Sequence, residues 1–449
     1  MSVTAVRGHL GIIHTQHISM EGDSIGTSII PIPLPPEIID TIIDQLYDEA
    51  RSLKQCSLVS KVFITRAQKH LFRTIKFQLP YRRLPLKYLL KVFDNNPSLT
   101  HHVEHLHVTN YFYSKQYTQR DEILPRICRH LCSGSLKSVF FQCARGMVHA
   151  NSISFDLATA LIQMFQSNKL IDITLDYCVN FPVIYLASTC AYLKRLSLIS
   201  LDSYQGFPLE IPPAYDDHLA TSGALALPIS SSTSRLEFLK IDYVAALAMQ
   251  KLYERVSHPP STFTFSHLRS IELHGHKTSM QEVAAAIIVD AASTLEEFDW
   301  DHNSSDPGPE FEDGCPIALG VTTNLRILKF ACMHPAETEP FHLLWVAQSL
   351  VAIKGHNHLE EIILVLYCHP QDIIEFGWRN SADWASSFDV LLASGDFEFL
   401  RRVEISIDFF DYGDEDDVTR DDCDRAHKCL EDRLPLLRGM GVLSISWIR

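Results

Sequence analysis

LRILKF, from Leu325 to Phe330, is one of eleven six-residue units with apolar residues at positions one, four and six. The other ten units are VEHLHV (103–108), LKSVFF (136–141), LIDITL (170–175), LKRLSL (193–198), LEFLKI (236–241), LRSIEL (268–273), LEEFDW (295–300), LEEIIL (359–364), LRRVEI (400–405) and MGVLSI (440–445). Successive units begin 23 to 43 residues apart, about the length of one strand, one helix and two loops. This period predicts an α/β fold in which strand-helix units stack sideways into a curved parallel sheet, a solenoid.

The stretches between the units have helical spacing, as in SISFDLATALIQMFQ (152–166), TSMQEVAAAIIVDAA (278–292) and FHLLWVAQSLVAIKG (341–355). Along each strand, alternation sends positions four and six into the core and positions three and five to the open face of the sheet. Position five is occupied by His107, Phe140, Thr174, Ser197, Lys240, Glu272, Asp299, Lys329, Ile363, Glu404 and Ser444. Most of this row are expected to be solvated strand residues, since few residues dominate an interface. The candidate contacts to a protein substrate are Phe140, Lys240, Glu272, Asp299, Lys329 and Glu404.

A different pattern precedes the repeats. LPPEIIDTIIDQL, from Leu34 to Leu46, has the prolines and the early acid of a helix start, and then five aliphatic residues at helical spacing. These five span roughly 140° of the helix, wide enough to serve one surface inside the domain and one outside. Two more short apolar helices follow, carrying Leu53, Cys56, Leu58 and Val59, and then Phe63, Ala67, Leu71 and Phe72. Three such helices make a very small core that often needs a partner.

The charge of this region differs from that of the whole chain. From Arg51 to Lys91 there are eleven Lys or Arg residues and no Asp or Glu, whereas the chain carries a formal charge of -15. This basic block suits an acidic protein partner, and complementary charge mainly speeds encounter.

The helical region resembles an F-box, in the F-box-like form common in fungal proteins. The resemblance rests on Leu34-Pro35-x-Glu37, the pairs Ile38-Ile39 and Ile42-Ile43, Leu46, Leu53-x-x-Cys56-Ser57-Leu58-Val59-Ser60-Lys61-x-Phe63 and Leu71-Phe72-Arg73. The chain departs from the family at Phe63, where tryptophan is usual. The repeats resemble an irregular leucine-rich repeat array. At position nine of the unit, where that family has Asn or Cys, only Cys178 fits among the clear copies.

The resemblance implies a substrate-recognition subunit of an SCF-type cullin-RING ubiquitin ligase, which is not itself an enzyme and needs no cofactor. Its F-box would dock on an acidic Skp-family adaptor, and its repeats would bind a protein substrate that the sequence does not identify. The implied adaptor contacts are Leu34, Pro35, Glu37, Ile38, Ile42, Leu46, Leu53, Leu58, Val59 and Phe63. The expected division is a disordered tail (1–31), an F-box-like domain (32–77), a linker (78–98) and a leucine-rich-repeat-like domain (99–449).

Several alternatives stay open. The first helices could cap the repeats, the basic block could bind RNA or DNA, or the chain could be a ligase-independent repeat scaffold. Gly22-Asp23-Ser24-Ile25-Gly26 fits the pattern of a hydrolase nucleophile elbow, but no strand pattern precedes it. The histidines at 101, 102, 105 and 107 are expected to be a surface cluster rather than a metal site, because no Cys or Asp set completes one. Nine acids between Asp408 and Asp424 are expected to form a solvated loop or to bind a basic segment.

The composition agrees with an ordinary soluble globular protein, with 46% apolar and 21% charged residues in 449. The net negative charge disfavours general affinity for nucleic acid or anionic membrane. Eleven cysteines without any CxxC spacing are typical of reduced intracellular thiols. No stretch approaches 18 successive apolar residues. We therefore expect a cytoplasmic or nuclear protein without nucleic-acid or membrane partners.

Overall fold

The computed structural model describes residues 35–78, 83–111, 123–143, 153–178, 181, 183–201, 234–242, 244, 246–258, 261–274, 279–302, 319–333, 341–355, 358–367, 382–408 and 419–448. The expected N-terminal tail, the Ser24 motif and Leu34 lie outside these ranges. Nearly all of two long stretches between repeat units, 202–234 and 301–316, which the sequence indicates to be insertions, also lie outside them. Most of the acidic stretch between Asp408 and Asp424 also lies outside them.

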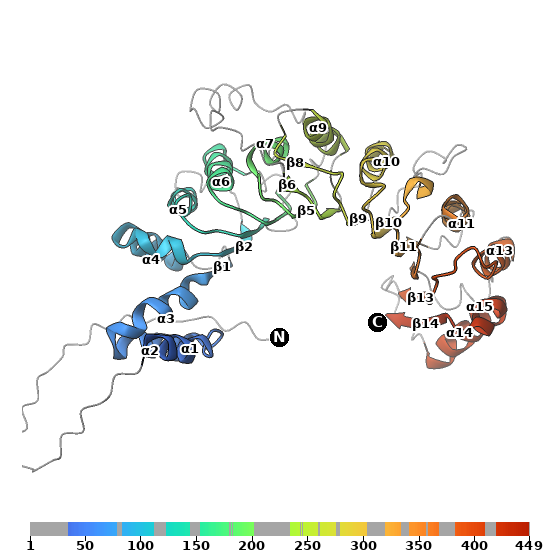
Figure 1. The fold of residues 1–449 in the computed structure, drawn as a ribbon, viewed down its shortest axis with the longest axis horizontal. Helices are drawn as coiled ribbons and strands as arrows, with labels where there is room; N and C mark the ends of the chain where they lie inside the picture. Colours follow the sequence, from blue (N-terminus) through green and yellow to red (C-terminus); the bar gives the residue numbers. More distant parts are fainter. Residues whose placement is uncertain are drawn as a thin grey trace, which may run out of the picture.

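The strands form one open sheet of twelve, in which every neighbouring pair is parallel and the spatial order follows the sequence (Figure 1). Its strands are β1 (Thr74–Gln78), β2 (His105–Tyr111), β3 (Ser138–Cys143), β4 (Asp172–Asp176), β5 (Arg195–Ile199), β7 (Phe238–Asp242), β9 (Ser270–His274), β10 (Glu297–His302), β11 (Ile327–Met333), β12 (Glu361–Tyr367), β13 (Arg402–Asp408) and β14 (Leu443–Ile448). A separate two-stranded sheet pairs β6 (Ser234–Arg235) with β8 (Phe263–Thr264). The predicted α/β fold with a parallel sheet is confirmed, and each of the eleven sequence units contains a strand.

Helices cover one side of the sheet. In Figure 1 the described chain forms an arch, with the strands on its inner side and the helices from α5 onward outside. The helices are α1 (Pro36–Asp44), α2 (Ala50–Val59), α3 (Lys61–Arg73), α4 (Arg83–Asn95), α5 (Ile123–Leu131), α6 (Phe155–Ser167), α7 (Leu186–Thr189), α9 (Ala246–Ser257), α10 (Ser279–Ala291), α11 (Phe341–Ile353), α13 (Ala382–Leu392), α14 (Arg420–Arg433) and α15 (Pro435–Met440), with short 3-10 turns η1 (Pro97–His102), η3 (Val183–Tyr185) and η5 (Leu319–Val321). The inner side of the sheet is therefore the side that α5 and the later helices leave uncovered.

Burial along the strands follows the predicted alternation. In LRILKF, Leu328 and Phe330 are buried while Lys329 between them is half-buried. Behind the sheet, α6 is capped by Ser154, whose hydroxyl accepts a hydrogen bond from the Leu157 backbone N–H at 3.2 Å. Seven apolar side chains of α6 are fully buried, because the helix packs between α5 and α7 as well as on the strands: Leu157, Ala158, Ala160, Leu161, Ile162, Met164 and Phe165.

Asn168 joins two consecutive repeats inside this layer. Its buried amide oxygen accepts from the Leu136 N–H at 3.1 Å, and its NH₂ group donates to the carbonyls of Leu131 at 3.1 Å and Met164 at 2.8 Å. These three backbone groups lie where helices give way to loops and strands. The Leu131 carbonyl also accepts from the Gly134 N–H at 3.0 Å. Cys178, at position nine of its unit, contacts the carbonyl of Phe141 on the neighbouring strand at 3.4 Å.

The sheet starts earlier than the sequence predicted. All of β1 except its last residue, Gln78, lies within the range expected for the helical domain, 32–77, and β1 pairs with β2 along its full length. The range 78–98, expected as a linker, contains α4, whose Leu86, Leu90 and Phe93 are buried in the large core. The linker prediction is therefore wrong for α4, which is the first helix of the sheet domain.

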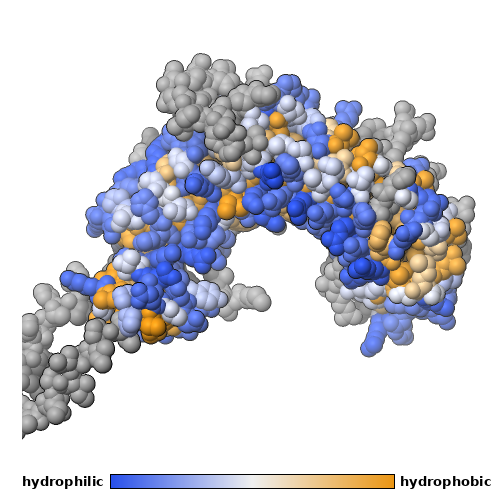
Figure 2. Space-filling view, viewed as in Figure 1, coloured by the Kyte–Doolittle hydropathy of each residue, from blue (hydrophilic) through white to orange (hydrophobic). Residues whose placement is uncertain are grey.

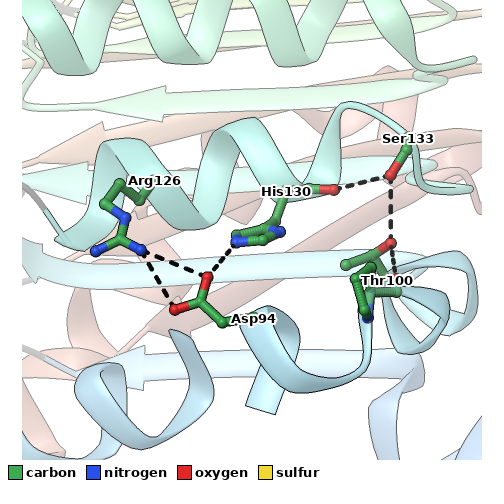
Figure 3. A network of polar contacts seen from close by, with 6 residues as sticks. Asp94, Thr100, Arg126, His130 and Ser133 are labelled. Carbon is green, nitrogen blue, oxygen red and sulfur yellow. Dashed lines mark hydrogen bonds and ion pairs between the residues drawn. The ribbon is translucent and has the colours of Figure 1, made fainter. Parts of the chain in front are cut away.

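Polar contacts also fasten α4 to the next repeat (Figure 3). Asp94 at the end of α4 accepts from the Nη2 of Arg126 at 3.3 Å and contacts the Nε2 of His130 at 2.8 Å, both on α5. In the turn η1, the hydroxyl of Thr100 lies 3.5 Å from that of Ser133, which donates to the His130 carbonyl. The view shows these groups bridging α4, η1 and α5, so α4 is held by the same helix layer as the repeats.

Candidate functional site

Two surfaces hold the residues that the sequence singled out: the outside of α1–α3 and the inner side of the sheet. The outside of α1–α3 exposes apolar side chains at positions where a solvated helix surface would have polar ones. Six of the sixteen exposed large hydrophobic side chains of the described residues lie on this short stretch, and Figure 2 shows apolar surface there: Ile38, Ile42, Tyr47, Leu58, Val59 and Val62. Exposed apolar groups concentrated on one small unit indicate an interaction site.

The core of this unit is small. It consists of the buried Ile43, Leu53 and Ala67, with Ile39, Leu46, Cys56, Phe63 and Leu71 packed against it. On α1, Ile43 points into this core, whereas Ile38 is 48% and Ile42 51% exposed. The wide apolar stripe of α1 is therefore divided between the buried core and the exposed outer side of the unit, and its use as a contact surface stays a prediction.

The predicted adaptor contacts divide between surface and core. Pro35, Glu37, Ile38, Ile42, Leu58 and Val59 are exposed, with Leu58 reaching 80%. Leu46 and Phe63 are half-buried against the core. Leu53 is only 1% exposed, so its assignment as a contact is wrong, because the inner face of α2 carries it into the core. Tyr47 and Val62 were missed; Val62 occupies the unassigned position between Lys61 and Phe63.

An ion-pair cluster holds α1 against α3. Asp44, at the end of α1, accepts from the Nε of Arg66 at 2.6 Å and also from its Nη2, and it contacts the Nε2 of His70 at 2.7 Å. Hydrogen bonds from Arg66 and then His70 hold the pKa of Asp44 well below its usual value. This cluster fixes the orientation of Ile38 and Ile42 relative to α3.

A carboxyl group with a lowered pKa stabilises the fold only while it is ionised. We expect the stability of α1–α3 to be constant from pH 7 to about pH 5, and to fall by about 1 kcal/mol as the pH drops below about 4. The loss is small because the Arg66 and Asp44 side chains are 30% and 36% exposed. Hydrogen exchange of residues 36–73, corrected for intrinsic rates, measures it. Asp44→Asn should be less stable at pH 7 and lose this pH dependence; an unchanged acid response in that variant would assign it to other groups.

Much of the basic block lies on the surface. Eight of its side chains are exposed: Arg51, Lys54, Lys61, Lys69, Arg73, Lys76, Lys87 and Lys91. Arg73 pairs with Glu104 at 3.2 Å, and Arg66 is held by Asp44. The exposed apolar groups of α2 and α3 therefore lie among basic side chains, whereas α1 itself carries the acids Glu37, Asp40 and Asp44.

The second surface is the inner side of the sheet, where position five of the units forms one row. The strand registers place Lys76, His107, Phe140, Thr174, Ser197, Lys240, Glu272, Asp299, Lys329, Ile363, Glu404 and Ser444 opposite one another in turn. Of the six predicted substrate contacts, four lie on the consecutive strands β7, β9, β10 and β11 and come together. Phe140 is separated from them by β4 and β5, and Glu404 by β12.

The four neighbouring residues form two ion pairs. Lys240 Nζ lies 2.7 Å from Glu272 Oε2, and Lys329 Nζ lies 2.7 Å from Asp299 Oδ2. Position seven of the units adds His274, whose Nε2 is 3.8 Å from Asp299, and Asp301, which accepts from the Tyr367 hydroxyl at 3.3 Å. We call these seven residues the central polar cluster: Lys240, Glu272, His274, Asp299, Asp301, Lys329 and Tyr367. His274, Asp301 and Tyr367 were missed, although extending the alternation beyond position six points to the first two.

The cluster is partly desolvated. Burial alone would raise the pKa of Asp299, but its contacts with His274 and Lys329 outweigh burial and lower it. Burial raises the pKa of Asp301 and of the Tyr367 hydroxyl. Among the described residues, Asp299 Oδ1, Asp301 Oδ1 and His274 Nε2 are buried without a hydrogen-bond partner. Buried polar atoms without a hydrogen-bond partner lower the stability of the fold. Such atoms are typical of surfaces that bind a ligand.

We expect Asp301→Asn to raise the free energy of unfolding by about 1 kcal/mol at pH 7. A carboxyl group whose folded pKa is raised destabilises the fold when ionised, and the cost disappears as the pH falls through that pKa. The gain should therefore shrink as the pH falls to about 4, toward the ordinary range of a carboxyl group. Urea unfolding at both pH values measures it. A loss of stability at pH 7 would instead mean that the Asp301 carboxylate is fully compensated in the folded chain.

Other candidate chemistry finds little support in the described residues. His105 and His107 lie on β2, where His105 Nδ1 contacts the Ser138 hydroxyl at 2.7 Å and His107 lies beside the Phe140 ring. No group of three or more His, Cys, Asp or Glu residues that could hold a metal occurs in the part of the chain that the structure describes. None of the described helices has the length and apolarity needed to cross a membrane.

Known proteins give no assignment. No protein-family model matches the chain, and no curated protein matches it.

Proposed function

We propose that this chain is the substrate-recognition subunit of an SCF-type cullin-RING ubiquitin ligase. In this proposal α1–α3 are an F-box-like domain that docks on a Skp-family adaptor. The strands and helices that follow are an irregular leucine-rich-repeat solenoid, whose inner side binds a protein substrate.

One observation carries the proposal. Ile38, Ile42, Leu58 and Val59, which belong to the F-box-like sequence pattern, are exposed apolar side chains on a unit with a three-residue buried core. Helices that only cap the repeats would pack such side chains against the repeats, whereas in the part of the chain that the structure describes these four remain exposed. The lysines and arginines of α2 and α3 suit an acidic adaptor, with the apolar groups supplying most of the affinity.

The solenoid assignment is supported by strand order. The twelve strands lie side by side in the order in which they occur along the chain, with only β6 and β8 left in a separate sheet, as expected when repeats stack one on another. The inner side then offers side chains from many repeats to one ligand. The central polar cluster has three carboxylates against two lysines and, with Asp242 in register beside His274, favours a substrate segment of net positive charge.

The chain itself would supply no acid, base or nucleophile. It would hold the substrate near a ubiquitin-loaded enzyme brought by other subunits, so the rate gain would come from raised effective concentration. This role needs two binding surfaces on one rigid body. α1–α3 and the inner side of the sheet are both present, and α3 leads into β1 without an intervening residue.

The test is a pull-down of the purified full chain with a purified Skp-family adaptor. We expect a stable complex that persists at moderate salt, because apolar contacts should dominate it. If the folded chain does not bind the adaptor, the ligase proposal is overturned. A ligase-independent repeat scaffold, with another partner for α1–α3, would then be the better account.

A further inference from the structure

The sheet has an open edge at β14. In the described sheet β14 is the last strand and pairs only with β13. The carbonyl of Val442 accepts from the Val403 N–H at 2.8 Å, so this carbonyl points toward β13, while the Val442 N–H donates to the Leu437 carbonyl at 3.3 Å. In a strand the backbone groups of successive residues point to opposite sides. Leu443 and Ile445 therefore direct their N–H and C=O groups toward the open edge.

The core is also incomplete at this end. On β13, Val403, Ile405 and Ile407 are fully buried, whereas their register partners on β14, Leu443, Ile445 and Trp447, are only half-buried. The adjoining helix α15 exposes Leu436 and Met440. Figure 2 shows apolar surface over α13 and α15 at this end of the arch. Covering this end would bury apolar surface as well as pair the strand edge.

β14 has none of the features that keep a strand edge from pairing. Proteins usually protect such edges with lysines, prolines or bulges. The sequence LSISWI of β14 contains no charged residue and no proline. The strand at the opposite end of the sheet, β1, carries the exposed Lys76 and follows directly on α3. The two ends of the sheet therefore differ, and only β14 is suited to add another strand.

We propose that β14 pairs in antiparallel fashion with β14 of a second copy of this chain, forming a closed two-fold dimer with one sheet continuous through both copies. A two-fold axis normal to the sheet places the inner side of one copy beside the inner side of the other. Ser444 and Ser446 then meet serines, and the half-buried apolar residues meet apolar residues. Because β14 is uncharged, self-pairing opposes no like charges within the strands. A chain of head-to-tail copies is disfavoured, because it would have to use β1.

The dimer does not depend on the ligase proposal, since it uses the opposite end of the arch from α1–α3. Its test is sedimentation of the purified full chain between about 1 and about 100 μM. Wild type is expected to pass from monomer to dimer, more readily at higher salt because each copy is strongly negative. The test variant is Ser444→Lys, and the matched control is Ser444→Thr.

Ser444 is exposed and lies opposite Glu404 of β13, so lysine there is compatible with the fold of a single copy. In the dimer it would put two positive charges into the paired strands. We expect the dissociation constant to rise about tenfold or more for Ser444→Lys and to change little for Ser444→Thr. Wild type, Ser444→Lys and Ser444→Thr should have similar midpoints of thermal unfolding when measured at a concentration where all three proteins are monomeric.

Hydrogen exchange locates the contact. The amides of Leu443 and Ile445 should become protected as the concentration of wild type rises, and should stay exchangeable in Ser444→Lys. A chain that remains monomeric at about 100 μM overturns the proposal. So does a dimer that Ser444→Lys leaves intact, or an assembly that keeps growing beyond two copies. Adaptor binding by α1–α3 is measured separately, so its failure would leave this result unaffected.

Discussion

Replacing Ile42 with Asp is expected to weaken binding of a Skp-family adaptor by about 100-fold, a cost of about 3 kcal/mol. Ile42 is 51% exposed on α1, one turn from the exposed Ile38, and outside the buried core of the unit. The substitution removes an apolar contact and would require burying a charge in the interface. It leaves Ile43 and its core partners unchanged. Titration calorimetry with the purified adaptor measures the loss.

The matched control is Val390→Asp on α13. Val390 is 60% exposed, so this change also puts an acid in place of an exposed aliphatic residue, but on a helix of the outer layer. We expect adaptor affinity to be unchanged in this variant, and hydrogen exchange of α1–α3 to be unchanged in Ile42→Asp. Equal loss of binding in both variants would show that added negative charge, rather than the α1 surface, is responsible. Undiminished binding of Ile42→Asp would exclude α1 from the interface.

Asn168→Ala is expected to lower the free energy of unfolding by about 3 kcal/mol. The side chain satisfies three backbone groups at the junction of two repeats, at 3.1, 3.1 and 2.8 Å. Because the site is buried, water cannot readily replace the amide, and the N–H of Leu136 and two carbonyls are left with lost hydrogen bonds. Urea unfolding followed by circular dichroism measures the change.

Asn324 provides the comparison. Its NH₂ group also joins consecutive repeats, donating to the Ser293 carbonyl at 2.5 Å, but the residue is exposed and water can take its place. We expect Asn324→Ala to cost about 0.5 kcal/mol. Similar costs for the two variants would mean that burial of the amide does not determine its contribution. A small effect of Asn168→Ala alone would indicate that a water molecule can enter the site.

The repeating part of the fold was predictable because each strand obeys the same local rule. Positions four and six, such as Leu328 and Phe330, must be apolar to fill the core between sheet and helices, and this requirement recurs in every unit. The side on which position five lies follows from alternation alone. The row from His107 to Ser444 could therefore be named from the sequence, and the strand registers reproduce it.

The first repeat escaped this reasoning because its unit overlaps a helix. Phe72-Arg73-Thr74-Ile75-Lys76-Phe77 has apolar residues at positions one, four and six like the others, and Ile75 and Phe77 are buried. Its first residue, however, lies in the last turn of α3, where helical spacing also accounts for it. α4 was missed for a related reason. Leu86, Leu90 and Phe93 have helical spacing, but the first of the eleven repeat units begins only after them, at Val103.

Details of the two surfaces depend on packing that local patterns do not encode. Leu53 and Leu58 are both leucines on α2, yet one is buried and the other is the most exposed apolar side chain of the unit. On a helix of three turns, which leucine faces inward depends on where α1 and α3 lie. The central polar cluster is likewise set by strand register. Asp301 and Tyr367 are 66 residues apart in the chain, and they meet because β10 and β12 flank β11.

The direct passage from α3 into β1 has a consequence for any target that the chain presents. Arg73 ends the helix and Thr74 begins the strand, and Arg73 is tied to Glu104 of the next repeat, so there is no hinge at this junction. In the proposed ligase, a substrate bound on the inner side of the sheet would keep a fixed orientation relative to the other subunits. The ubiquitin-loaded enzyme could then reach only the lysines on one side of the substrate. Inserting a few glycines after Arg73 would then change which lysines are modified without changing what is bound. The junction would determine which lysines of a substrate are modified, not which substrate is bound.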